Sequence, residues 1–149
     1  MVDIGRLGRM TRIATLRRDR NEIALADAGR VREAREGALA QARAAEARAS
    51  ERLKDADRMF AAEPASPQAQ VWRRVQVERA AQARAEAETR VAFRDEAALA
   101  HDRARVELMR SDARLDRTEA LHARAASAYA AVRDEREAED RAHRPRGAA

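Results

Sequence analysis

The chain has 149 residues, with 31 basic and 26 acidic side chains and a net charge of +5. Alanine is the most frequent residue, with 39 copies, whereas Leu, Ile, Val and Phe together number 22, which is too few to fill the core of a globular domain. Because the net charge is small and Ala, Arg and Glu favour helix, we expect helix and not disorder. The absence of cysteine excludes disulfides and thiolate sites.

Two of the three prolines, Pro64 and Pro67, lie close together between two long alanine-rich runs. Proline inside a helix costs about 3 kcal/mol, so helix should stop before this segment and restart after it. We predict one helix over residues 4–62, a turn at 63–67 and a second helix over 68–143. The fold class is therefore all-α, a single-domain, long two-helix antiparallel coiled-coil hairpin over residues 1–149.

In the first half, the apolar spacing suggests a seam with an 11-residue repeat, because Val31, Ala42 and Leu53 are 11 residues apart. Such a repeat predicts a nearly straight helix pair. Larger side chains near the amino end predict that the helices pack best there. These residues are Leu7, Met10, Ile13, Leu16, Ile23 and Leu25.

The second half has a heptad-like pattern in two series. One contains Leu108, Leu115 and Tyr129, with His122 between the last two, and the other contains Leu99 and Val106. Folding the chain back at the turn sets large residues of the two halves opposite one another. The predicted neighbours are Phe60 with Val71, Leu25 with Val106, Ile23 with Leu108, Leu16 with Leu115, and Met10 with Leu121.

The basic excess is concentrated near the two ends of the sequence. Residues 1–20 carry six arginines against two acids, and residues 141–149 carry three arginines and no acid. An antiparallel fold should gather these groups at its open end, where they would seek an acidic partner. In the predicted register, residues 128–143 have no partner within the chain, although Tyr129 and Val132 are apolar.

The sequence contains no pattern that indicates catalysis. His101, His122 and His143 lack metal-ligand spacing, and adjacent acids such as Asp95 and Glu96 point to different faces of a helix. We therefore expect no enzyme activity, no catalytic, cofactor-binding or metal-binding residues, and no cofactor. With four aromatic residues in all, we expect no nucleic-acid binding. The basic segment 4–16 allows at most peripheral contact with a membrane.

A cluster of large side chains flanks the predicted turn at residues 63–67. Because Trp is a preferred anchor at interfaces, this tip is either a partner contact or a cap that packs the turn. The cluster comprises Met59, Phe60, Val71, Trp72 and Val75.

Several segments together resemble the FliJ/YscO family, the stalk proteins of flagellar and type III secretion export ATPases. Residues 16–22, Leu-Arg-Arg-Asp-Arg-Asn-Glu, precede an Ala-rich run as in the opening segment of that family. Near the carboxyl end, Glu119, Leu121, Arg124 and Tyr129 followed by the charged residues 135–140 resemble its closing helix, with Arg124 one place short of the family spacing.

This resemblance implies a central stalk that couples a hexameric ATPase to an export gate, located in the cytoplasm at the periphery of the inner-membrane export apparatus. The implied partners are the hexameric secretion ATPase and the export gate protein; some family members also bind export chaperones. We expect a monomer without these partners. The tip would contact the gate, and the ATPase ring would contact Arg6, Arg9, Arg12, Arg17, Arg18, Arg20, Tyr129, Arg141 and Arg144.

Two other functions stay open from the sequence. One is a self-assembling coiled-coil scaffold or membrane-surface coat, and the other is an arginine-rich nucleic-acid binder, which the small net charge and scarce aromatic residues disfavour.

Overall fold

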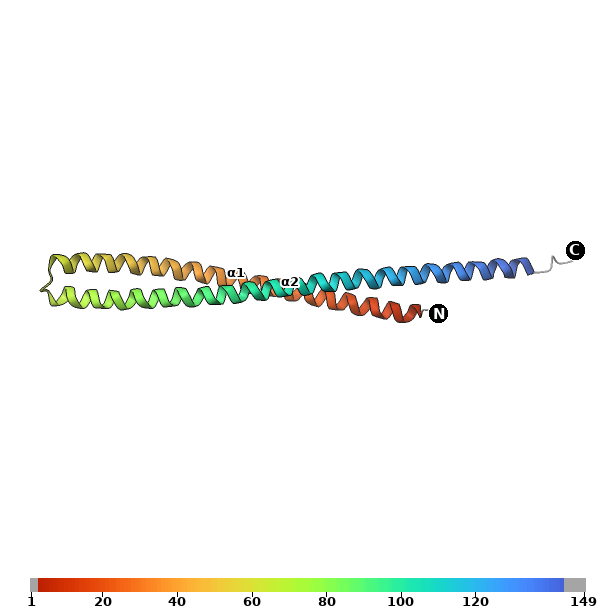
Figure 1. The fold of residues 1–149 in the computed structure, drawn as a ribbon, viewed down its shortest axis with the longest axis horizontal. Helices are drawn as coiled ribbons and strands as arrows, with labels where there is room; N and C mark the ends of the chain where they lie inside the picture. Colours follow the sequence, from red (N-terminus) through yellow and green to blue (C-terminus); the bar gives the residue numbers. More distant parts are fainter. Residues whose placement is uncertain (1–2, 144–149) are drawn as a thin grey trace. The chain divides into compact units, whose positions relative to one another are not determined.

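The computed structural model describes residues 3–143, which form two long helices joined by a short turn (Figure 1). Helix α1 spans Ile4–Ala62 (59 residues) and α2 spans Pro67–His143 (77 residues). The described part of the chain contains no strand, and the two helices pack against each other in antiparallel directions. The predicted all-α helical hairpin is therefore confirmed.

The turn forms where the two prolines predicted it. Ser66 caps α2, because its Oγ accepts a hydrogen bond from the Ala69 amide at 3.3 Å. Pro67 is the first residue of α2, one residue earlier than predicted. Proline is tolerated at this position because the first amides of a helix donate no intrahelical hydrogen bond. The Gln70 side chain closes the turn by donating to the Pro64 carbonyl at 3.1 Å.

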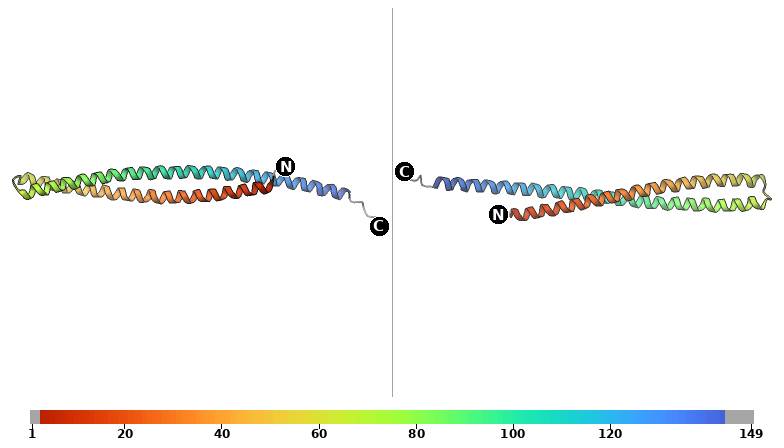
Figure 2. Two further views of the ribbon diagram at one scale, coloured as in Figure 1. Left: turned by 90° about the horizontal axis from the view of Figure 1, so that it is seen from below. Right: turned by 180° about the vertical axis from the view of Figure 1, so that it is seen from behind.

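The chain divides into two compact units. The turn unit comprises Leu25–Ala104 and therefore contains the turn and the adjoining halves of both helices. The end unit comprises the described residues 3–24 and 105–143. Within each unit, the segments of α1 and α2 lie side by side (Figure 2). That all 149 residues behave as a single domain stays a prediction.

The register of the helix pair agrees closely with the predicted one. In the end unit, Arg18 contacts Asp112, and in the turn unit Asp57 contacts Arg73. Each of these contacts is displaced by one residue from the predicted register. A Cβ placed on Gly8 would lie 3.7 Å from His122, so these two residues also face each other, as do Gly29 and His101.

The seam between the helices follows a seven-residue repeat along both helices, so the predicted 11-residue series in α1 holds only in part: Ala42 and Leu53 lie in the seam, but Val31 does not. In α1 the less exposed positions include Leu25, Arg32, Leu39, Leu53 and Phe60, which are separated by seven residues or multiples of seven. Val31, which the 11-residue repeat placed in the seam, is 51% exposed. The heptad places large apolar residues such as Leu39 in the interface of α1 together with Ala42 and Ala56, so leucine and alanine share the buried surface.

In α2, the predicted series through Leu108, Leu115 and Tyr129 is confirmed in part. Leu108 and Leu115 lie in the seam, as does the intervening His122, whereas Tyr129 is 57% exposed. The second predicted series is wrong, because Leu99 is 59% exposed and Val106 is 41% exposed. Buried residues at seven-residue spacing belong to a different series, and most are small or polar. They are Ala69, Gln76, Ala97 and Ser111.

The large apolar residues near the amino end lie outside the seam, which corrects the prediction that packing is best there. Leu7 and Leu25 are half-buried, but Met10, Ile13, Leu16 and Ile23 are 45–64% exposed. Their three-residue steps carry them around the helix, away from the heptad positions. The buried apolar residues of the described chain all lie in the turn unit instead: Leu39, Ala42, Ala56, Ala69, Ala87 and Ala97.

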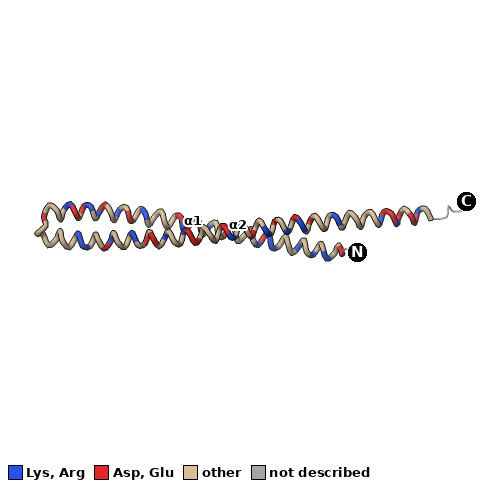
Figure 3. Tube along the Cα trace, viewed as in Figure 1, with Lys and Arg blue, Asp and Glu red and all other residues tan. Residues whose placement is uncertain are grey.

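Acidic and basic residues alternate along both helices (Figure 3). Many pair within one helix at three- or four-residue spacing, as Arg90 does with Glu86 at 2.6 Å and Arg84 with Glu88 at 3.1 Å. Exposed pairs of this kind contribute only about 0.3–0.5 kcal/mol each. These paired charges keep the helix surfaces soluble. Charged side chains without a partner are therefore the better candidates for contacts with other molecules.

Candidate interaction surfaces

The end unit carries a groove of about 740 Å3 along one flank of the helix pair. From α1, side chains spaced three or four residues apart line it, beginning at Met10 and ending at Ala24. From α2, the lining runs from Glu107 to Thr118 with the same spacing. We call this surface the basic groove, because it is lined by Arg17, Arg20, Arg110, Arg114 and Arg117.

The arginines of the basic groove are largely unpaired. Arg110 lies 2.6 Å from Glu107, the one acidic residue in the lining, and so neutralises it. Within residues 3–143, the other four arginines form no ion pair. The groove therefore combines a concave apolar surface, to which Met10 and Ile13 contribute, with uncompensated positive charge.

Arg18, which lies in the same unit, connects the two helices. Its Nε donates to Asp112 Oδ1 at 3.3 Å across the seam, and its Nη1 lies 2.7 Å from Glu22. The hydrogen bond to Asp19, followed by the charge of Glu22 and the hydrogen bond to Asp112, raises the pKa of the Arg18 guanidinium above its ordinary value. A group whose pKa is raised on folding stabilises the fold below that pKa, so the Arg18 guanidinium stays charged up to strongly alkaline pH.

The predicted ring-contact arginines of α1 have two roles in the structure. Arg6, Arg9, Arg12, Arg17 and Arg20 are exposed, as a contact with a partner requires. Arg18 is partly covered by its acidic neighbours and joins the two helices. Arg9 also has an acidic neighbour, Asp3, at 4.0 Å, but both side chains of that pair are largely exposed.

The arginines of the two chain ends do not meet, contrary to the prediction that the fold gathers them. Gly8 faces His122, so α1 begins near the level of residue 126, and Arg141 lies about 22 Å farther along α2 at 1.5 Å per residue. Five acidic residues occupy positions 134–140 in between. The predicted contact Arg144 lies outside the described residues.

Beyond the start of α1, α2 continues alone. Every residue from 126 to 143 is exposed, which confirms that this extension has no partner within the described chain. Tyr129 is 57% exposed and Val132 is 47% exposed. We call residues 126–143 the α2 extension.

Sequence reasoning missed the arginines that α2 contributes to the basic groove. Arg110, Arg114 and Arg117 were passed over because acidic residues alternate with them in the sequence. Their spacing of four and then three residues places them on one face of a helix, and that spacing was the available signal.

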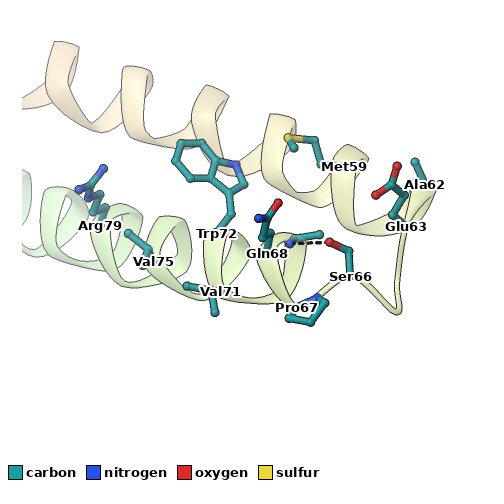
Figure 4. Close-up of a pocket in the computed structure, with 11 residues that line it drawn as sticks. Met59, Ala62, Glu63, Ser66, Pro67, Gln68, Val71, Trp72, Val75 and Arg79 are labelled. Carbon is teal, nitrogen blue, oxygen red and sulfur yellow. Dashed lines mark hydrogen bonds between the residues drawn. The ribbon is translucent and has the colours of Figure 1, made fainter.

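The turn unit has a groove of its own, of about 730 Å3 (Figure 4). Four of the five predicted tip residues line it together. Val71 and Met59 are 60% and 56% exposed, and Trp72 is 40% exposed. We call it the tip groove; its large apolar residues are Met59, Val71, Trp72 and Val75.

The fifth predicted tip residue, Phe60, does not line the tip groove. Its ring lies beneath the Arg73 guanidinium, with 5.4 Å between the guanidinium carbon and the ring centroid. Arg73 also pairs with Asp57 at 2.7 Å, so Phe60 and Arg73 join the two helices near the turn. Phe60 therefore packs across the turn, whereas Met59, Val71 and Trp72 are exposed and Val75 is half-buried. That these residues contact a partner stays a prediction.

Within residues 3–143, no three His, Asp or Glu side chains are grouped in a way that could hold a metal ion. A search of the same residues finds no helix that is both long enough and apolar enough to cross a membrane. Comparisons with protein-family models, with curated proteins and with solved structures find no match to this chain.

Proposed function

We propose that the chain is a non-enzymatic stalk of the FliJ/YscO type, which couples a hexameric protein-secretion ATPase to its export gate. The sequence resemblance suggests this function. The two ends of the helix pair offer chemically different surfaces, one rich in arginine and one apolar, as a part that connects two partners would need.

The observation that carries the proposal is the architecture of the end unit. Two antiparallel helices expose arginines on α1, and α2 then continues as a single helix with no partner in the chain. The exposed arginines on α1 include Arg6, Arg9 and Arg12, which lie outside the basic groove. In the proposal, this end enters the ring of the ATPase, as the end of a rotor shaft does.

An ATPase ring has several equivalent subunits, whereas the end unit has no symmetry that matches them. Its exposed arginines therefore contact only some subunits at one time. As nucleotide turnover changes the acidic surface of each subunit, the preferred orientation of the stalk changes too. In this proposal, ATP hydrolysis is coupled to the stalk because the ring subunits bind it with different affinities in their different nucleotide states.

The tip groove is the proposed contact with the export gate. Exposed Trp and Val side chains around a concavity are typical of binding hot spots, because they bury apolar area at low entropic cost. Within the stalk proposal, Trp72 with Met59, Val71 and Val75 form the anchor for the gate, and Phe60 holds the turn in shape.

The direct test measures the ATP hydrolysis rate of the secretion ATPase from the same organism, with and without this chain. We expect stimulation by the native chain and its loss in the triple variant Arg6→Glu, Arg9→Glu, Arg12→Glu. Arg18 is left unchanged because its reversal would also break the contact with Asp112.

The matched control reverses three exposed arginines of the turn unit, Arg43→Glu, Arg48→Glu and Arg103→Glu, which changes the net charge equally. It should keep the stimulation. If the native chain does not change the ATPase rate, or if both triple variants lose the effect equally, the stalk proposal is wrong.

One observation favours the second candidate, a self-assembling scaffold or membrane-surface coat. The exposed apolar residues of α1, which include Leu16 and Ile23 at 62% and 64% exposure, form a surface that self-assembly would cover. Light scattering and co-sedimentation with anionic vesicles separate the two candidates. A stalk stays monomeric and in the supernatant, whereas a coat polymerises or pellets with the vesicles.

A further inference from the structure

The basic groove has the shape and chemistry of a binding site for a helix. From Met10 to Ala24 its α1 side extends about 21 Å, which is four turns of an α-helix. It lies between two parallel rows of side chains, so a third helix placed in it would contact both α1 and α2. Grooves of this kind are filled by the apolar face of an amphipathic helix.

The lining defines the chemistry of the occupant. Met10 and Ile13 are 45% and 50% exposed within the groove, and the small side chains of Ala14 and Ala24 leave room beside them. Such a surface favours leucine-like side chains at three- and four-residue spacing. The four unpaired arginines favour carboxylates on both flanks of that apolar face.

We propose that the basic groove is a docking site for an acidic amphipathic helix of a partner protein. The inference does not depend on the stalk proposal, because it rests on the groove alone. Arg17 and Arg20 bind carboxylates on one flank of the occupant, and Arg114 and Arg117 bind those on the other. The seam interactions of Arg18 hold the two rows in place.

The α2 extension of a second copy is a poorer occupant. It offers two large apolar residues, Tyr129 and Val132. Its acidic residues are interspersed with arginines and are partly neutralised within the same helix, as Glu137 is by Arg133 at 3.4 Å and by Arg141 at 3.5 Å. A separate helix with uninterrupted acidic flanks complements the groove better.

A nucleic acid is also a poorer occupant. None of the aromatic residues lines the groove, so it provides no stacking surface for bases. A phosphate backbone would pair with the arginines but would leave Met10 and Ile13 uncovered.

The test uses the full chain and a fluorescent synthetic helix of about 15 residues, which matches the length of the groove. The peptide has leucines along one face, glutamates on both flanks and alanine elsewhere. Binding is measured by fluorescence anisotropy at two salt concentrations. We expect saturable binding that weakens with added salt, and no binding of the same peptide with lysine in place of every glutamate.

Three variants locate the site. In Arg17→Glu, Arg114→Glu, Arg117→Glu, the affinity should fall about tenfold or more, because like charges then face each other. The control Arg43→Glu, Arg48→Glu, Arg103→Glu should bind as the native chain does. Ile13→Ser, at a half-exposed position, should weaken binding without changing the helical circular dichroism signal or its thermal midpoint.

Other outcomes overturn the proposal. Equal binding of the lysine peptide, or equal losses in the two triple variants, would mean nonspecific attraction. Displacement of the glutamate peptide by an equimolar single-stranded oligonucleotide would indicate nucleic acid as the occupant. A dimer in sedimentation velocity that the groove variant abolishes would indicate a second copy.

Discussion

Gln76 is the largest side chain that is fully buried among the described residues, at 0% exposure. It occupies a heptad position of α2, where a coiled coil usually places an apolar side chain. Neither its Oε1 nor its Nε2 has a hydrogen-bond partner among residues 3–143. A buried amide without a hydrogen-bond partner lowers the free energy of unfolding, so Gln76 destabilises the seam.

We therefore predict that Gln76→Leu, which keeps the approximate size of the side chain, raises the free energy of unfolding by about 1–3 kcal/mol. Urea denaturation followed by circular dichroism measures this change. The matched control Gln82→Leu lies on the exposed surface of the same helix and should change it by less than about 0.5 kcal/mol. A loss of stability in Gln76→Leu would mean that the amide makes a necessary interaction.

At the scale of the element, the two helices and their turn could be predicted from the sequence, because Pro64, Ser66 and Pro67 act locally. The register could also be predicted, since a short turn between long helices leaves little freedom in their pairing. The face of each helix that packs in the seam could not be predicted from the sequence. The size of Met10, Ile13 and Leu16 predicted that they would pack in the seam. The less exposed residues nearby are instead Thr11, Arg18 and Asn21.

The physical reason is that alanine and long polar side chains can fill a narrow seam between closely packed helices. In the end unit, Met10 and Ile13 then remain outside the seam, where they form a groove with arginine. The basic groove was predicted only in part. Arg17 and Arg20 belong to the basic excess of residues 1–20, but the groove also needs Arg110, Arg114 and Arg117, which come from the other helix, where acidic residues alternate with them.

A pair of substitutions in α1 tests the seven-residue seam against the 11-residue repeat. Leu39 is 5% exposed and Val31 is 51% exposed. We predict that Leu39→Ala lowers the free energy of unfolding by about 2–5 kcal/mol. Val31→Ala should lower it by less than about 0.5 kcal/mol. Equal losses at the two sites in chemical denaturation would restore the 11-residue seam.

Ending the chain after Ala125 tests the independence of the α2 extension. Because residues 126–143 are exposed throughout, we expect the thermal unfolding midpoint to stay unchanged. Differential scanning calorimetry measures it. In the stalk proposal, the shortened chain should also stimulate the ATPase less, since Tyr129 and Arg141 are removed. A large fall in the midpoint would show that the extension packs against another part of the chain.

At the scale of the whole molecule, the proposals depend on both ends of one chain contributing to one surface. The basic groove needs residues near position 17 and residues near position 114, which the sequence separates widely and the fold brings together. The tip groove needs the residues on either side of the turn. A chain that folded as separate helices would have neither groove.

The most direct test of this arrangement is the distance between spin labels on Met10→Cys and Leu121→Cys. The chain has no native cysteine, so the labels attach only at these two exposed positions of the end unit. Packed helices have an interaxial distance of about 8–10 Å, so double electron–electron resonance should give a narrow distribution below about 25 Å once the label arms are included. A broad distribution centred far above that distance would contradict the antiparallel pairing of the end unit and the basic-groove proposal.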